Sequence, residues 1–247
     1  MTKLIDLRGE EFNCVRQYFR PGIRVLEIGG GNGLQASLIA ATGAEVHSID
    51  VTAQPEGSQM FFPVSIYDGH TIAFPDKTFD LVFSSNVLEH IRHLDAILIE
   101  TKRVLKTDGT AIHILPTPSW RIWTSLSHYV YFLKRIFSLA GSRIGDAHVE
   151  HPTSEARPVR RRDIVKRALR AGPHGEYPSA FSELWYFSRT RWESVFRKNA
   201  FDVLESRPSK LFYTGYVVFP WLSLGLRKAL SSLLGSSTRI FILRNKP

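Results

Sequence analysis

Val25-Leu26-Glu27-Ile28-Gly29-Gly30-Gly31-Asn32-Gly33 is the stretch of this 247-residue chain that decides its fold. A strand-like apolar run leads directly into a glycine-rich turn, and a helical pattern follows over residues 32–41. Because glycine has no Cβ, such a turn lets a ligand approach the backbone at the N-terminus of the next helix. A second apolar run, residues 46–49, ends at Asp50, about 20 residues further on, where nucleotide-binding folds place an acceptor for ribose hydroxyl groups.

The same alternation of strand and helix continues along the chain. Apolar runs predict strands at residues 24–28, 45–49, 61–66, 79–84, 110–115, 201–206 and 238–243. Apolar residues at helical spacing predict helices at residues 9–19, 32–41, 94–105, 123–140, 190–199 and 222–233, and residues 160–170 are predicted to form a basic amphipathic helix. This order is typical of an α/β fold with a doubly wound, mostly parallel sheet of seven strands. Ligands of such folds bind at the carboxyl ends of the strands, where the glycine turn and Asp50 lie.

The spacing of the glycines argues against two common nucleotide sites. Counted from Gly29, a dinucleotide-binding turn would need Gly or Ala at the position of Leu34. The Gly-Lys-Ser/Thr of a triphosphate-binding loop is absent from the turn. The pattern present is Glu27-x-Gly29-x-Gly31-x-Gly33. With it the chain resembles the class I, Rossmann-like S-adenosylmethionine-dependent methyltransferases, above all their small-molecule branch (methyltransferase type 11) related to quinone-biosynthesis enzymes.

Three further segments carry the resemblance. Tyr67-Asp68-Gly69, followed by Phe79-Asp80, is similar to the family's third and fourth strand region, although Ile72-Ala73 stands where Leu-Pro is usual. The run from Ser84 to His90 resembles the strand and turn that hold the methionine end of the cofactor. Residues 104–110 resemble the segment in which the family's helix ends before the fifth strand. The resemblance implies a Rossmann-like fold, with helical insertions here after the fifth and sixth strands.

The resemblance also implies S-adenosylmethionine as cofactor, and a set of residues that bind it. The glycine turn would lie against the sugar and methionine portions, and Asp50 would accept both ribose hydroxyl groups. Asp68 would accept a hydrogen bond from the adenine amino group. Taken alone, the two aspartates also fit a structural role, as turn or capping residues. The implied cofactor-binding residues are Glu27, Gly29, Gly30, Gly31, Gly33, Asp50, Val51, Asp68, Gly69, Ser84 and Asn86.

Two histidines are the predicted catalytic residues. His90 follows the strand that lines the predicted cleft and is a candidate general base or substrate contact. His174 precedes the last core helix, in a segment similar to one in methyltransferases of polysaccharide or glycolipid pathways, and would reach over the cleft as a second candidate base. A framework role is the alternative for each. No metal site is predicted, because the one His- and Glu-containing cluster, residues 148–151, is short and lies in an irregular segment.

The chain is predicted to form a single methyltransferase domain, residues 1–247. Residues 1–118 would form the cofactor-binding core and residues 119–189 a helical, basic insertion, and residues 190–247 would complete the sheet around a second insertion at 210–237. Residues 1–118 carry a formal charge of −4, whereas residues 119–247 carry +13. This asymmetry indicates either an anionic partner or surface for the second half or a solvated basic face.

The expected acceptor is a small molecule or a lipid-linked saccharide or quinone-like lipid, methylated on oxygen. The two aromatic-rich insertions would either form a lid over the acceptor or contact an anionic membrane surface. An RNA methyltransferase remains an alternative because of the basic half, but Ser84-Ser85-Asn86-Val87 lacks the motif for methylating a base amine. A cofactor-binding protein without catalysis is the third alternative, against which the intact cofactor motifs argue.

The predicted location is cytoplasmic, with the inner membrane surface as a peripheral site if the insertions meet lipid. Residues 1–10 show no apolar run of the kind that forms a signal peptide. Cys14 is the single cysteine, so a disulfide scaffold within the chain is excluded. The sequence indicates no oligomeric state.

Overall fold

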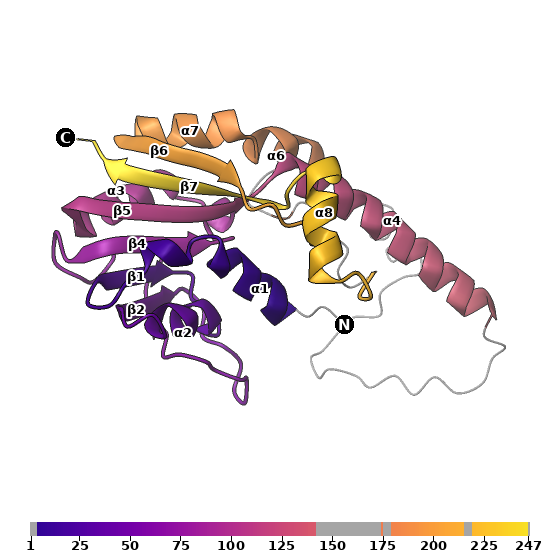
Figure 1. The fold of residues 1–247 in the computed structure, drawn as a ribbon, viewed down its shortest axis with the longest axis horizontal. Coiled ribbons are helices and arrows are strands. Elements are labelled where there is room, and N and C mark those ends of the chain that lie inside the picture. The colour runs from indigo at the N-terminus through magenta and orange to yellow at the C-terminus, as the bar shows by residue number, and fades with distance from the viewer. Residues whose placement is uncertain (1–3, 142–173, 175–178, 215–218, 247) are drawn as a thin grey trace.

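A computed structural model describes residues 4–141, 174, 179–214 and 219–246 of the chain. Its centre is a seven-stranded sheet in the order β3-β2-β1-β4-β5-β7-β6 (Figure 1). All neighbouring pairs are parallel except those that involve β7, which is antiparallel to β5 and β6. This order confirms the predicted doubly wound α/β fold. The strands are β1 (Arg24–Ile28), β2 (Glu45–Asp50), β3 (Ser65–Ile66), β4 (Phe79–Ser85), β5 (Leu105–Pro116), β6 (Phe201–Pro208) and β7 (Thr238–Asn245).

The helices follow the predicted order with two differences. The helix expected at residues 9–19 begins earlier, at Leu4, and breaks after Asn13, where a short 3-10 turn takes over because Val15 leaves helical geometry. The segment 180–186 was not predicted to be helical, yet Ser179 caps a helix there by accepting a hydrogen bond from the Ser182 N–H. The helical elements are α1 (Leu4–Asn13), η1 (Arg16–Tyr18), α2 (Leu34–Ala40), η2 (Leu88–His90), α3 (Leu94–Val104), α4 (Pro118–Gly141), α6 (Ala180–Tyr186), α7 (Arg189–Lys198) and α8 (Leu224–Leu234).

The sheet carries a separate apolar cluster on each face. Side chains alternate along a strand, so Val25 of β1 packs on one face and Leu26 on the other. On the Val25 side the sheet is covered by α1, η1 and α2, with Phe12 and Phe19 in its core. On the Leu26 side α3 and α7 supply the covering residues, among them Trp192. Because both faces are buried, the sheet is a rigid support for the residues at the carboxyl ends of its parallel strands.

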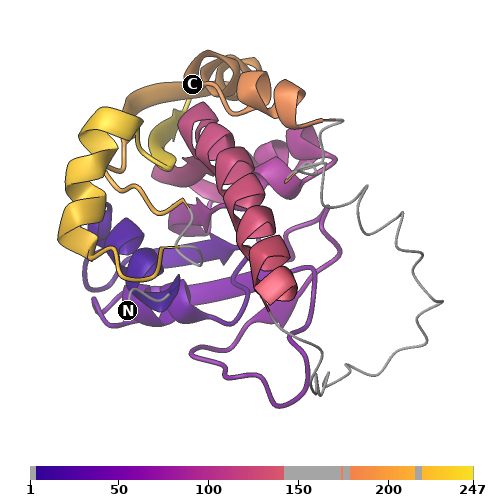
Figure 2. The same cartoon turned by 90° about the vertical axis from the view of Figure 1, so that its right-hand side faces the viewer.

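Three helices gather at the carboxyl ends of the parallel strands. In Figure 1, α1, α4 and α8 lie beyond the right-hand end of the sheet, and Figure 2, which looks onto that end, shows α4 running across it. The Trp123 indole donates a hydrogen bond to the Leu234 carbonyl at 2.9 Å and ties α4 to α8. The helical insertions after the fifth and sixth sequence strands are thereby confirmed where they are described, and they stand at the ligand-binding edge of the sheet.

Some predicted features fall on other parts of the chain. The basic amphipathic stretch 160–170 and the His- and Glu-containing cluster at residues 148–151 lie outside the described residues. The expected strand at 61–66 is reduced to Ser65–Ile66, because residues 61–64 form a bend that passes over the glycine turn instead of pairing with β2. None of the described helices is long and apolar enough to cross a bilayer.

Candidate active site

The glycine turn after β1 adopts a conformation that larger residues disfavour. Gly29, Gly31 and Gly33 have positive φ angles of 78°, 55° and 77°. A Cβ on Gly30 would come within 2.0 Å of the Ser48 hydroxyl, and one on Gly33 within 2.5 Å of the Phe62 carbonyl oxygen. The turn is therefore a stretch of bare backbone beside the cavity at the start of α2, where no side chain of Gly29, Gly30 or Gly31 stands between the chain and a ligand.

Asp50 stands at the end of β2, directly beside this turn. One carboxylate oxygen accepts the Gly31 N–H at 2.8 Å, and the other accepts the Thr52 N–H at 3.1 Å. The Gly29 and Gly30 N–H groups donate to the Ile49 carbonyl oxygen, and these bonds also fasten the glycine turn to the end of β2. Backbone bonds thus hold the carboxylate in place while its remaining lone pairs face the open cavity.

A cavity of about 450 Å³ opens between the glycine turn, the ends of β2 and β4, and α1. Its size is in the range of small-molecule sites. Of the sequence-predicted site residues, the structure brings together around this cavity Gly29, Gly30, Gly31, Asp50, Val51, Asn86 and His90. The six other predicted residues do not line it: Glu27, Gly33, Asp68, Gly69, Ser84 and His174.

Glu27 lies beneath the turn, not in the cavity. Its carboxyl group is buried and accepts a hydrogen bond from the Ser48 hydroxyl at 2.6 Å. Burial raises the pKa of Glu27 to about 7, and this hydrogen bond offsets the rise only in part. The residue supports the glycine turn from behind, between β1 and β2.

Asp68 and Gly69 form a loop next to the cavity. The Asp68 carboxylate accepts the N–H groups of Thr71 and His70, each at 2.7 Å, and these bonds hold its pKa below the usual range. A Cβ on Gly69 would lie 3.1 Å from the Val51 side chain. The loop therefore packs beside Val51, and Tyr67, which precedes it, reaches the cavity.

The two serines at the end of β4 point to opposite sides. Ser84 is fully buried, and its hydroxyl lies 2.8 Å from Nδ1 of the buried His113. Burial lowers the pKa of His113 to about 3, so this pair is neutral. Ser85 instead lines the cavity. Strand alternation requires that only one of two neighbouring serines faces the cavity, but the sequence does not say which.

Sequence reasoning missed the contribution of α1 and of the second insertion. Leu4, Ile5 and Arg8 of α1 line the cavity, although the predicted helix began after them. Tyr213, at the start of the second insertion, donates a hydrogen bond to the Asn86 side-chain oxygen at 3.3 Å. No local motif signals these contacts, since they join segments far apart in the chain.

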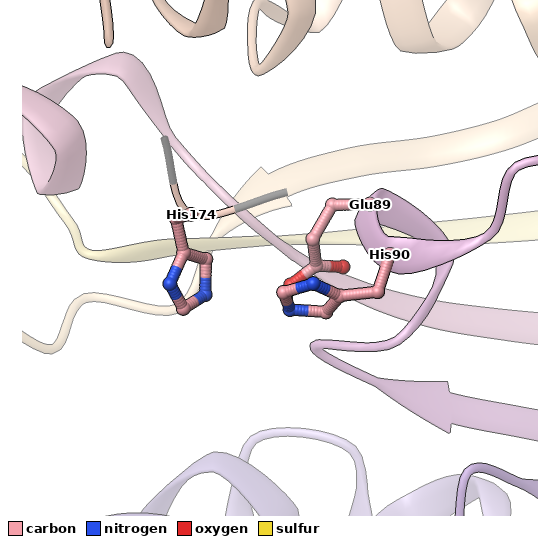
Figure 3. Close-up of side chains that lie close together, drawn as sticks. All are labelled: Glu89, His90 and His174. Carbon is pink, nitrogen blue, oxygen red and sulfur yellow. The ribbon is translucent and has the colours of Figure 1, made fainter. Parts of the chain in front are cut away.

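The predicted catalytic histidines come together and are joined by Glu89. Figure 3 shows the three side chains directed at one space. Glu89 and His90 belong to η2, whereas His174 comes before α6 in the chain. The rings of His90 and His174 have centroids 4.8 Å apart, and His90 Nε2 lies 3.8 Å from the Glu89 carboxylate. Glu89 is fully buried, and this burial raises its pKa to about 8. Burial, with the nearby charges of His90 and Arg121, lowers the pKa of His174 to about 4, so its ring is neutral at pH 7.

The residues around the cavity fit the cofactor that the sequence predicts. The glycine turn lines the cavity with backbone and suits close contact with a ligand, and Asp50 offers a carboxylate to a pair of ribose hydroxyl groups. Val51 and Tyr67 offer apolar surface beside it for a planar base. Asn86, at φ 56°, begins the turn that leads from β4 to His90, on the opposite wall.

Comparisons with known proteins agree with this geometry. A family model for the methyltransferase domain matches residues 9–206. A ubiquinone/menaquinone biosynthesis C-methyltransferase from Cupriavidus metallidurans is 30% identical over 150 residues, which make up 55% of this chain and 60% of that protein. The chain thus matches less than two thirds of the length of this relative.

Solved structures share the fold at low identity. An S-adenosylmethionine-dependent methyltransferase from Archaeoglobus fulgidus superposes with a TM-score of 0.54 at 15% identity, covering 98% of this chain and 94% of that one. The 1,6-didemethyltoxoflavin-N1-methyltransferase of Burkholderia thailandensis, solved with S-adenosylhomocysteine, gives 0.53 at 12% identity, covering 98% and 78%. With its sheet order, its glycine turn and the family match over most of its length, the chain belongs to the class I S-adenosylmethionine-dependent methyltransferases.

Proposed function

We propose that this enzyme transfers a methyl group from S-adenosylmethionine to an oxygen atom of a small-molecule or lipid-linked acceptor. The observation that carries the proposal is the position of His90. Its side chain lines the same cavity as the glycine turn and Asp50, at the opposite wall, and stands beside Glu89 and His174. A proton acceptor is thereby available where the acceptor would meet the cofactor.

The chain's part in this reaction is mainly binding and orientation. The cofactor supplies the activated methyl group, so the protein needs to hold two reactants in line and to exclude water. In this proposal the Gly29–Gly31 backbone and Asp50 hold the cofactor on one wall. Arg8 and Ile5 of α1 close the cavity on a second side.

His90 is proposed to take the proton from the acceptor hydroxyl group. Its side chain is 43% exposed, so it can exchange the proton with solvent, whereas Glu89 beside it is buried. His174, with a pKa of about 4, is a weaker base and is placed to orient the acceptor by a hydrogen bond. General base catalysis of this kind typically contributes about 10²–10⁴-fold in rate.

The proposed acceptor class rests on the surface around the cavity mouth. The helices beside this end of the sheet expose large apolar side chains, including Phe181 (85% exposed), Trp185 (62%) and Leu233 (83%). The second half of the chain carries a formal charge of +13. Exposed apolar side chains and a basic second half of the chain suit a lipid-linked or anionic acceptor and a peripheral contact with an anionic membrane.

Methyl transfer to carbon is the second candidate, because the curated relative is a C-methyltransferase by name. Methyl transfer to oxygen and to carbon both need a base near the methyl group, and His90 would supply it in either reaction. The products differ, however, because an O-methyl ether or ester and a C-methyl group give different fragments and different carbon chemical shifts.

The test is methyl transfer from isotope-labelled S-adenosylmethionine to small molecules and lipids extracted from cells. We expect a labelled product that is heavier by one CH₂ group, with the label on oxygen. His90→Ala should lower kcat by at least about tenfold while cofactor affinity is kept. His47→Ala, which removes a histidine of β2 that does not line the cavity, is the matched control. Label on carbon would select the second candidate, and no labelled product from any extract would contradict both.

A further inference from the structure

Glu89, His90 and His174 form a group whose ligand atoms all lie within 4.8 Å of one another. Glu89 and His90 come from the short turn η2 after β4, and His174 comes from a segment more than 80 positions later in the chain. Figure 3 shows the two rings and the carboxylate facing a common space. Two imidazoles and one carboxylate are a donor set that binds transition-metal ions.

The Glu89 carboxyl group is the part of this cluster that most needs a partner. It is fully buried, and neither of its oxygens forms a hydrogen bond with any residue that the structure describes. A buried carboxyl group without partners is costly, so a position of this kind calls for a bound proton or a bound cation.

The positive charges near the cluster are paired with carboxylates and so do not prevent a cation from binding. Two arginines lie near it, and each is paired with a buried glutamate: Arg8 contacts Glu11 at 2.5 Å, and Arg121 contacts Glu183 at 2.8 Å. Both positive charges are therefore already compensated. When a cation binds and the Glu89 carboxyl group releases its proton to solvent, the carboxylate would supply negative charge next to the histidines.

His174 is held in position by a second layer of contacts. Its backbone N–H donates to Glu183 at 2.5 Å, and Glu183 in turn pairs with Arg121 of α4. The Trp120 ring lies 4.5 Å from the His174 ring, centroid to centroid. Outer contacts of this kind orient ligand side chains at metal sites.

From these observations we infer that Glu89, His90 and His174 bind one divalent transition-metal ion, such as Zn²⁺, Mn²⁺ or Co²⁺. Ligand bonds of about 2.0–2.2 Å require the three ligand atoms to approach one another to roughly 3.5 Å, which rotation of the two exposed histidine side chains allows. Three protein ligands leave at least one coordination position open, as in catalytic metal sites.

The site goes beyond the proposed function and does not depend on it. Because His90 also lines the cofactor cavity, the open position would face the space proposed for the acceptor. A cation there would bind an acceptor oxygen and make its hydroxyl proton easier to lose. In the metal-bound enzyme His90 is then a ligand, and the proton leaves to solvent.

Binding of the metal alone tests the inference without an acceptor. The full chain, freed of purification tags and dialysed against a chelator, is titrated with Co²⁺ and followed by visible absorption, and with Zn²⁺ by calorimetry. We expect one equivalent to bind, with a visible absorption band that reports nitrogen ligands. His90→Ala, His174→Ala and Glu89→Gln should each lower the affinity by at least about tenfold. His128→Ala, which changes a histidine of α4 outside the cluster, should leave it unchanged.

Cofactor binding by each variant shows whether it folds. If Co²⁺ produces no band in the unaltered chain, or if a variant that binds S-adenosylmethionine normally still binds Co²⁺ with unchanged affinity, the inference is wrong. If the unaltered chain binds S-adenosylmethionine and transfers its methyl group but binds neither Co²⁺ nor Zn²⁺, the metal site is overturned and the proposed methyltransferase function stands. Loss of cofactor binding by the unaltered chain would instead overturn the proposed function alone.

Discussion

The carboxylate of Asp50 accepts the backbone N–H of Gly31 at 2.8 Å and so joins the end of β2 to the loop after β1. One side chain thereby shapes the glycine turn and offers its remaining lone pairs to a ligand. The bond also explains why an acidic residue at the end of the second strand is useful here, because β2 pairs with β1 and ends beside this turn.

Asp50→Ala should weaken S-adenosylmethionine binding by roughly 10- to 100-fold, since hydrogen bonds to a charged group contribute about 1.5–3 kcal/mol each. Calorimetry with the cofactor measures this. Asp108→Ala, an exposed aspartate at the opposite end of the sheet, is the matched control and should bind normally. An Asp50→Ala affinity within twofold of the unaltered chain would remove Asp50 from the cofactor site.

Gly33→Ala should lower the free energy of unfolding by about 1–3 kcal/mol, because the residue has φ 77° and a Cβ would press on the Phe62 carbonyl oxygen. Gly9→Ala is the control. Gly9 lies in α1 with nothing within 4 Å of an added Cβ, so alanine there should stabilise the protein by up to about 1 kcal/mol. Urea denaturation of the two variants should give shifts of opposite sign.

Glu27→Gln should flatten the pH dependence of stability between about pH 4.5 and 7. The pKa of Glu27 is about 7 in the folded protein and near 4.5 when unfolded, so the unfolded chain releases this proton first as the pH rises. The folded state therefore loses stability across that interval, by roughly 3 kcal/mol at most. Glutamine removes this titration and can still accept the Ser48 hydrogen bond. Equal pH slopes for the variant and the unaltered chain in urea denaturation would contradict the prediction.

Arg121→Met should destabilise the protein by about 3–5 kcal/mol, because it leaves the fully buried Glu183 carboxylate without its partner. Arg189→Met breaks the ion pair with Glu193, in which the arginine side chain is 58% exposed, and should cost no more than about 1 kcal/mol. Thermal denaturation of the two variants compares a buried pair with an exposed one on neighbouring helices. Similar losses of stability in both variants would show that burial does not determine how much the Arg121–Glu183 ion pair contributes.

The exposed aromatic side chains of α6 should contribute to membrane contact. We expect the unaltered chain to co-float with vesicles that contain anionic lipid, and to do so less at high salt. Phe181→Ser with Trp185→Ser should reduce co-flotation, while Phe74→Ser, in the partly buried surface at the opposite end of the sheet, should leave it unchanged if folding is kept. If the unaltered chain does not co-float at all, the insertions act as a lid and not as a membrane contact.

Much of the fold could be predicted because its signals are local. Apolar runs of the β1 type mark the buried strands, and three- and four-residue spacing marks α3 and α7. The predicted helix at 9–19 starts later than α1 because residues 4–8 mix apolar and charged positions with no helical spacing of their own. Strand β3 was overestimated, since residues 61–64 are held by contacts with the glycine turn, such as the bond from the Phe61 N–H to the Asn32 carbonyl.

The cofactor side of the site was predictable for the same reason. The glycine turn and Asp50 are each marked by short-range patterns, and both line the cavity. Which of the two serines lines the cavity could not be predicted. Ser84 is turned away from it toward the buried His113, and this contact depends on how β4 packs against β5. The roles of Arg8 and Tyr213 depend on helices and insertions that return to the same edge of the sheet.

By itself the sequence determined the parallel sheet, the glycine turn and the type of cofactor, because hydrophobic periodicity and the freedom of glycine act over a few neighbouring residues. Only the tertiary structure decided that His174 meets His90, and that Glu89 is the buried third member of their group. The physical reason is distance along the chain. Contacts across more than 80 residues arise from the packing of α4 and α6 on the ends of the strands, and no local pattern records them.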